Sequence, residues 1–240
     1  NFWKKRFPLF RMELEPVSGR VPGLENRVFA VAPIGVRGRQ GDAMTKSRDQ
    51  REPVVERGPG GRAQAHRWPM GTDPEALRDF LADVFTNYWD QIIFGPIIDG
   101  AAYAPTCPGP PDKFELDGEF LTVGFNGPHF HICVGTRQPG RGDPAREARM
   151  RMLRPASAAL FRMLDGKGAP NSWGFEMRNA AGISMLTIFF ANPFVLPGDK
   201  LAEEPDWSRL LMWREISLRY LGRKAEAFDQ SSRGFDFQAA

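Results

Sequence analysis

Residues 128–135 read Pro-His-Phe-His-Ile-Cys-Val-Gly, and this stretch predicts a β-strand around which the fold is organised. Successive side chains of a strand point to opposite faces, so its apolar and its ligand-type residues separate. One face holds Phe130, Ile132 and Val134. The other holds His129, His131 and Cys133. The first face predicts a core contact. The second is the candidate site, because the whole chain has three histidines and two cysteines.

Turn signals on both sides of this strand predict β-hairpins. Asp117-Gly118 separates the apolar runs at 114–116 and 120–125, and Asn126-Gly127 leads directly into the His-rich strand, which we expect to pair with residues 120–125. Such dipeptides favour tight turns between antiparallel strands. Residues 173–179 and 183–190 form a second hairpin pattern around Ala-Ala-Gly at 180–182, and residues 62–68 read as a first strand.

Three segments carry helix start signals. Asp73-Pro74 and Asp143-Pro144 each place a capping carboxylate before a proline, and Pro205-Asp206 opens the third segment. We expect helices to about residue 89, to about residue 164 with a break or kink at Pro155, and to about residue 221. Hairpins alternating with helices predict an α+β fold, an antiparallel sheet with helices packed mainly on one face. Its other face, with the histidines, would be open.

Charge and composition suggest three regions. Residues 1–67 hold 14 Lys/Arg against 7 Asp/Glu, so the basic character lies in the N-terminal part and the remaining chain carries about −4. We expect residues 1–57 to be a disordered or loosely attached basic arm, residues 58–222 a single α+β domain and residues 223–240 a mobile tail. Residues 1–43, which precede Met44, could be an upstream extension outside the functional protein.

The same features narrow the class of protein. A mildly acidic body makes nucleic-acid binding unlikely, since phosphate contacts need a clustered basic surface. No apolar run reaches the 18 or so residues of a membrane span, so no membrane partner is expected. Two cysteines form no disulfide framework, which favours the cytoplasm.

A His-x-His strand suggests a transition-metal site. Two imidazoles on one face can converge on one ion, with His66 or Cys133 as the third ligand. Zinc is the first expectation, with iron or copper as alternatives. The chain lacks HExxH and CxxC motifs. The competing interpretation is that His129, His131 and Cys133 pack against a loop or a partner subunit and bind no metal at all.

Further candidates come from charged residues on other segments. Glu176 could act as a general base or carboxylate ligand, provided that its strand neighbours the histidine strand. Arg137 and Arg178 could bind an anionic group of a small-molecule substrate, although arginine-rich runs are more often solvated surface.

Several segments together resemble a family of uncharacterised bacterial proteins. They read Arg-Trp-Pro-Met at 67–70, Phe-Gly-Pro at 94–96, Gly-Pro-His-Phe-His-Ile-Cys-Val-Gly at 127–135 and Glu-Pro-Asp-Trp-Ser-Arg-Leu at 204–210. The resemblance covers residues 54–222 and implies that the basic arm is an appendage. It implies no activity and no catalytic residues.

Together these observations predict a transition-metal-binding domain that uses the His-x-His strand, with small-molecule metalloenzyme activity as one form of it. The alternative is a non-catalytic binding or dimerisation module, a homodimer whose open sheet face is the interface. A metal or haem carrier without chemistry is a third interpretation.

Overall fold

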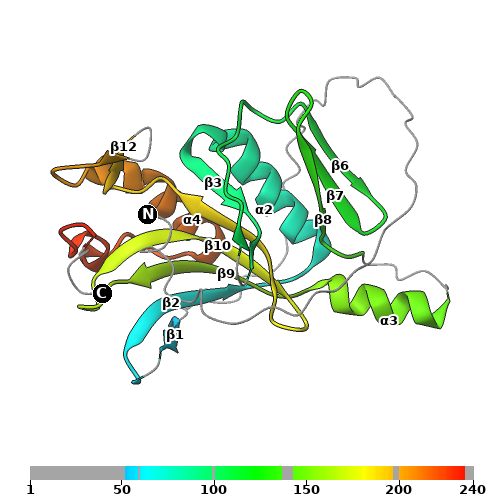
Figure 1. The fold of residues 1–240 in the computed structure, drawn as a ribbon, viewed down its shortest axis with the longest axis horizontal. Coiled ribbons are helices and arrows are strands. Elements are labelled where there is room, and N and C mark those ends of the chain that lie inside the picture. The colour runs from blue at the N-terminus through cyan, green and yellow to red at the C-terminus, as the bar shows by residue number, and fades with distance from the viewer. Residues whose placement is uncertain (1–51, 59, 99–100, 137–142, 197–199, 236–240) are drawn as a thin grey trace.

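The computed structural model describes residues 52–58, 60–98, 101–136, 143–196 and 200–235 (Figure 1). Residues 1–51 of the arm expected at 1–57, the Met44 boundary and Arg137 lie outside these residues. What is described is built from a six-stranded sheet, a three-stranded sheet, two short pairs of strands and helices.

The large sheet has six strands in the order β1-β2-β9-β10-β11-β3, and every neighbouring pair is antiparallel. Its strands are β1 (Val54–Arg57), β2 (Ala63–Met70), β3 (Ile92–Gly95), β9 (Pro155–Leu164), β10 (Pro170–Asn179) and β11 (Ser184–Phe190). The β10–β11 hairpin is the one that the sequence predicts.

A second sheet contains the His-rich strand in the order β6-β7-β8. Its strands are β6 (Lys113–Asp117), β7 (Phe120–Gly124) and β8 (His129–Cys133). Two short pairs complete the strands: β4 (Ile97–Ile98) with β5 (Ala101–Ala102), and β12 (Val195–Leu196) with β13 (Lys200–Leu201). The predicted pairing of residues 120–125 with the His-rich strand is confirmed, but in a sheet separate from the large one.

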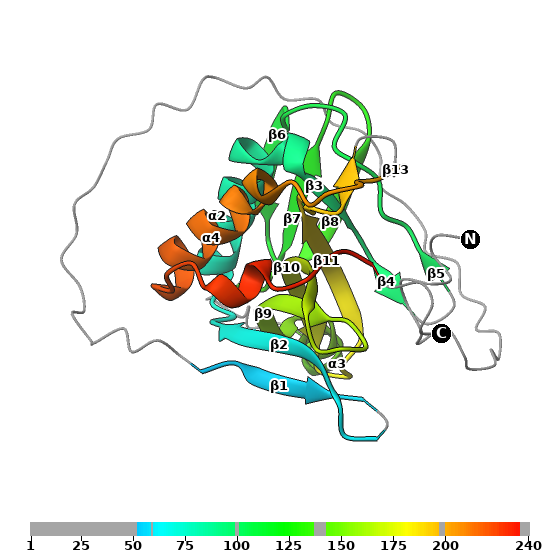
Figure 2. The same ribbon diagram turned by 90° about the vertical axis from the view of Figure 1, so that its left-hand side faces the viewer.

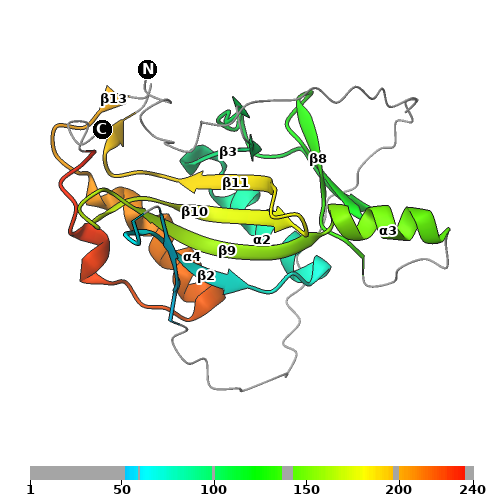
Figure 3. The same cartoon turned by 60° about the horizontal axis from the view of Figure 1, so that its bottom comes forward.

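Helices α2 and α4 cover one face of the large sheet (Figure 2), whereas α3 extends away from its end (Figure 3). The helical elements are α2 (Pro74–Asn87), η1 (Trp89–Gln91), α3 (Pro144–Leu153), η2 (Trp207–Leu210), α4 (Leu211–Leu221) and η3 (Ala227–Gln230). Asp73 caps α2 by accepting a hydrogen bond from the Ala76 N–H, as its place before Pro74 predicts. The α+β class with helices mainly on one sheet face is therefore confirmed.

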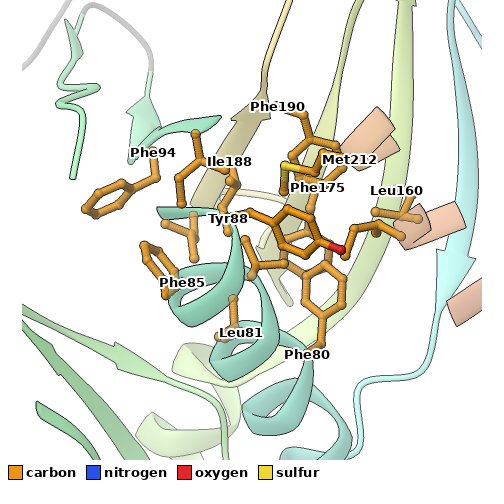
Figure 4. Close-up of a cluster of buried hydrophobic side chains, with 14 of the residues drawn as sticks. Phe80, Leu81, Phe85, Tyr88, Phe94, Leu160, Phe175, Ile188, Phe190 and Met212 are labelled. Carbon is orange, nitrogen blue, oxygen red and sulfur yellow. The ribbon is translucent and has the colours of Figure 1, made fainter. Parts of the chain in front are cut away.

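The core lies between the covered face of the sheet and these helices (Figure 4). Phe80 of α2 packs on Phe175 of β10 with ring centroids 4.4 Å apart, and both side chains are fully buried. Ile188 of β11 and Leu160 of β9 contribute from the same sheet face. Phe85, on another side of α2, contacts Phe94 of β3 in the large sheet and Phe130 of β8 in the small one. Helix α2 therefore joins the two sheets.

Residues 155–164 differ from the sequence-based expectation, which continued the 143–164 helix across Pro155. The helix ends at Leu153, Arg154 is extended at ψ 151°, and β9 begins at Pro155. A proline has no N–H for an intrahelical bond. The residues after it pair with β2 on one side and β10 on the other, so β9 is an interior strand of the large sheet.

Both predicted domain boundaries also differ. Residues 54–57, expected in the loose arm, form β1 and pair with β2. Residues 223–235, expected in the mobile tail, pack back on the body through η3, where Asp229 is 2 % exposed. Backbone pairing with β2 holds the first segment in place, and the hydrogen bonds of the buried Asp229 hold the second. Neither interaction follows from local composition.

Candidate functional site

Strand β8 has the alternation that its sequence predicts. Phe130 packs on Phe85 of α2 and Phe94 of β3, with centroid distances of 5.5 and 5.2 Å. On the opposite face, His129 and His131 are exposed. The strand is an edge of its sheet, paired with β7 on one side. The apolar face thus anchors the strand and leaves the imidazoles at the surface.

The two imidazoles lie side by side, with ring centroids 5.2 Å apart and planes at 74°. His129 Nδ1 is 3.1 Å from the Gly127 carbonyl oxygen, and His131 Nδ1 is 2.8 Å from Thr122 Oγ1 on β7. The sequence indicated the pair, but the two partners that orient the rings come from the turn and the neighbouring strand.

Cys133 follows the histidines in the same alternation but is 5 % exposed. Burial raises the pKa of its thiol, and the thiolate is the form that binds metal. Cys107 is buried as well, which raises its pKa to about 12. Neither cysteine therefore supplies an accessible thiolate ligand.

His66 lies in the other sheet, on the covered face of β2. Its Nδ1 accepts a hydrogen bond from Arg162 Nε at 3.0 Å, and its ring stacks on Phe228. Burial, and then the charge of Arg162, lower the pKa of His66. Among the residues that the structure describes, no group of three or more His, Cys, Asp or Glu side chains is placed to hold a metal ion. The structure does not bring His66 or Cys133 into a three-ligand set with the other two histidines.

Arg162 belongs to a buried polar network that the sequence did not indicate. Its Nη1 donates to Asp229 Oδ1 at 2.9 Å and to Glu226 Oε2 at 2.6 Å. Asp229 also accepts the indole N–H groups of Trp173 and Trp213, at 3.1 and 3.0 Å. The network joins β9 and β10 to α4 and η3. Nothing in the local pattern at 223–235 signals it, because its partners are 16 to 67 residues away.

The open face of the large sheet carries a different charged cluster. Glu176 of β10 accepts from Arg67 Nη1 at 2.6 Å and lies 3.0 Å from Arg178 Nε. Arg67 also donates to Glu56 of β1 at 2.5 Å, and its guanidinium lies over the Phe161 ring. The strands next to β10 are β9 and β11, so Glu176 does not neighbour the histidine strand, and the condition for its role beside the histidines is not met.

A cleft of about 370 Å³ opens beside this cluster. Phe161, Met163 and Phe189 form apolar lining from the sheet, and Ile97, Ile98 and Ile183 line it from β4 and the 180–183 turn. Glu176 and Arg178, both singled out from the sequence, line the cleft together with Arg67. Arg67 was missed as a site residue. Its only sequence signal was its place in the Arg-Trp-Pro-Met motif.

Comparison with known proteins places the chain in a family. The model of a family of unknown function (DUF7676) matches residues 53–222, and the chain belongs to that family. This agrees with the resemblance drawn from the sequence motifs. No curated protein matches the chain.

Two solved structures resemble parts of it. One is the crystal structure of ChuX, whose sequence is 14% identical to this chain. The match covers 66% of this chain and 78% of the ChuX chain, with a TM-score of 0.38. A protein from Erwinia carotovora is 15% identical, with coverages of 65% and 76% and a TM-score of 0.36. No helix within the described ranges has the length and apolar character to cross a membrane.

Proposed function

We propose that this protein binds a small amphipathic anion in the cleft on the open face of the six-stranded sheet. The observation that carries the proposal is the cleft itself, an apolar hollow with two arginines at one side. Its volume of about 370 Å³ lies within the range of about 300–1,000 Å³ usual for small-molecule sites. The proposal corresponds to the binding-module alternative rather than to a metalloenzyme.

The apolar lining defines the body of the ligand. Phe161 and Phe189 meet edge to face at 5.8 Å and are almost fully buried, so they form a fixed floor. Ile98 and Ile183 stand at the rim with exposed fractions of 47% and 55%. Covering such side chains with a ligand removes apolar surface from water, which favours binding. An aromatic or branched aliphatic group fits this lining.

The charged lining defines the head of the ligand. Arg67 is already shared between two carboxylates, but Arg178 contacts Glu176 alone among the ion pairs that the structure gives, and 40% of its side chain is exposed. With two arginines and one glutamate in the lining, an anionic group has the better match. A carboxylate or sulfonate would pair with the guanidinium of Arg178. In this site Glu176 orients both arginines, and its predicted role as a general base stays a prediction.

The proposal is tested with 1-anilinonaphthalene-8-sulfonate, which combines an aromatic body with a fixed negative charge. Titration of the full chain should give a saturable rise in fluorescence. Arg178→Gln should weaken binding roughly tenfold, because a hydrogen bond to a charged group contributes about 1.5–3 kcal/mol. Ala181→Trp, at the exposed turn that lines the cleft, should block it.

The matched control is Arg151→Gln on α3. The side chain of Arg151 is 70% exposed, and Arg151 does not line the cleft. It should bind as the unmodified chain does. The uncharged analogue N-phenyl-1-naphthylamine should bind the Arg178→Gln variant and the unmodified chain equally. Equal binding of the charged probe by the unmodified chain, Arg178→Gln and Arg151→Gln would overturn the proposal.

The competing occupant of the open face is a second copy of the chain. Light scattering during size-exclusion chromatography decides between them: a dimer that Ala181→Trp converts to a monomer would mean that the face is an interface, and would contradict a ligand cleft. The two free, buried cysteines are compatible with a cytoplasmic site of action, which we include in the proposal.

A further inference from the structure

We propose that His129 and His131 bind one divalent transition-metal ion, zinc or copper in type, through their two Nε2 atoms on the exposed face of β8. The site is separate from the cleft: it lies in the three-stranded sheet, whereas the cleft lies on the six-stranded one. Water or an exchangeable small ligand would fill the remaining coordination positions. The ion would therefore be bound reversibly.

The spacing of the rings fits a shared ion. Zinc–nitrogen bonds of about 2.0–2.1 Å place a ring centroid roughly 3.2 Å from the metal. Two centroids 5.2 Å apart then subtend roughly 110° at the ion, close to the tetrahedral angle that zinc prefers. Both rings are exposed, so an ion reaches them without any movement of the core.

The hydrogen bonds of the rings leave the right atoms for the metal. A carbonyl oxygen only accepts, so His129 Nδ1 must carry the proton that it shares with Gly127. The Nε2 atom of the neutral ring then has a free lone pair. His131 reaches the same state when its Nδ1 donates to Thr122 Oγ1. Metal-binding histidines usually donate their second ring nitrogen to a protein oxygen in this way, which fixes tautomer and orientation.

The surrounding residues explain why this is a two-ligand site. Thr122 pairs with His131, and Glu115 of β6 pairs with Thr122, so all three share one sheet face. Glu115 is two strands away, roughly 9–10 Å at the strand spacing of about 4.8 Å. It is also ion-paired with Lys113 at 2.9 Å. The carboxylate of Glu115 is too distant to be a direct ligand. Cys133, the next residue on the histidine side of β8, is buried.

A chelate makes a specific prediction about single substitutions. Zinc titrated into the full chain without a histidine tag, followed by calorimetry, should give one ion per chain. His129→Asn and His131→Asn should each lower the affinity at least tenfold, because either change leaves a single imidazole ligand. Thr122→Val should lower it by a smaller factor, since it removes only the group that orients His131.

The third histidine supplies the matched control. His66 lies in the six-stranded sheet, so His66→Asn should leave the zinc affinity unchanged. Arg178→Gln should also leave it unchanged, although it weakens binding of the probe in the cleft. Circular dichroism establishes that each variant keeps its fold. Absence of zinc binding overturns the proposal. So does a loss of only about twofold in each single variant, which would mean two independent imidazoles, or an equal loss in His66→Asn.

Discussion

Both faces of the six-stranded sheet carry ion pairs between a carboxylate and arginine, but these pairs differ in their exposure to solvent. Each holds a carboxylate in contact with arginine: Asp229 with Arg162 on the covered face, and Glu176 with Arg67 and Arg178 on the open face. On the covered face both partners are almost fully buried, with side-chain exposures of 3% and 6%. On the open face Arg178 reaches solvent. Burial, and not residue type, separates this stabilising network from the proposed binding site.

The covered face has little freedom to exchange partners. The two oxygens of Asp229 satisfy a guanidinium and two indole N–H groups. At this depth the two indole N–H groups depend on this carboxylate, whereas Arg162 also donates to Glu226 and His66. The open face has a cleft next to its charges, and the proposed ligand would compete there for Arg178. Three substitutions test whether the two faces differ in this way.

The largest effect is expected for Asp229→Ala. It leaves Arg162 and two indole N–H groups without their shared buried acceptor, and removing one partner of a buried ion pair typically costs about 3–5 kcal/mol. Chemical denaturation followed by tryptophan fluorescence measures the free energy of unfolding. Asp79→Ala on α2, where 68% of the side chain is exposed, is the control and should change it by less than about 0.5 kcal/mol. If both variants unfold at the same denaturant concentration, the network does not stabilise the fold.

A smaller effect is expected for Glu176→Gln on the open face. The amide keeps the shape and one acceptor but loses the charge that holds two partly exposed arginines, so we expect a cost of about 1–2 kcal/mol. The same denaturation assay measures it. The cleft probe should bind this variant at least as tightly, because both guanidinium groups lose an anionic competitor. A loss of stability as large as that of Asp229→Ala would mean that the two faces do not differ as described.

The smallest effect concerns pH and His66. Its pKa is lowered in the folded protein by burial and by Arg162, so as the pH falls through about 6.5 the unfolded chain takes up the proton first. The contribution of His66 is thus present above its ordinary pKa of 6.5 and is lost as the pH falls toward the lowered value. Comparing unfolding at about pH 7.5 and pH 5.5, the unmodified chain should lose more stability than His66→Gln. Equal losses in both chains would contradict this assignment.

Local patterns predicted the parts of this fold that depend on neighbouring residues. The Asp73-Pro74 start of α2, the β10–β11 hairpin and the apolar face of β8 rest on capping, turn chemistry and alternation, which act within a few residues. Strand β9 was missed because its local pattern also suits a helix. Its place between β2 and β10 is decided by pairing with segments that are distant in sequence.

For the candidate site too, the sequence indicated individual residues, whereas their neighbours depended on the tertiary fold. The sequence indicated His129 and His131 as one pair, since residues two apart on a strand must share a face. It also named Glu176 and Arg178, but the choice of their companions depended on the order of strands. That order places them beside Arg67 and an apolar cleft instead of beside the histidines.

The α+β class, the main turns and the separation of apolar and polar side chains on β8 could be predicted from local sequence, because they follow from short-range backbone and hydrophobic preferences. Which side chains meet depends on how the distant segments pack. That packing put His66 into a buried network with Arg162 and left the other two histidines exposed on a separate sheet. The physical reason is that long-range contacts are selected by the burial of the whole core, and no segment of the chain carries that information alone.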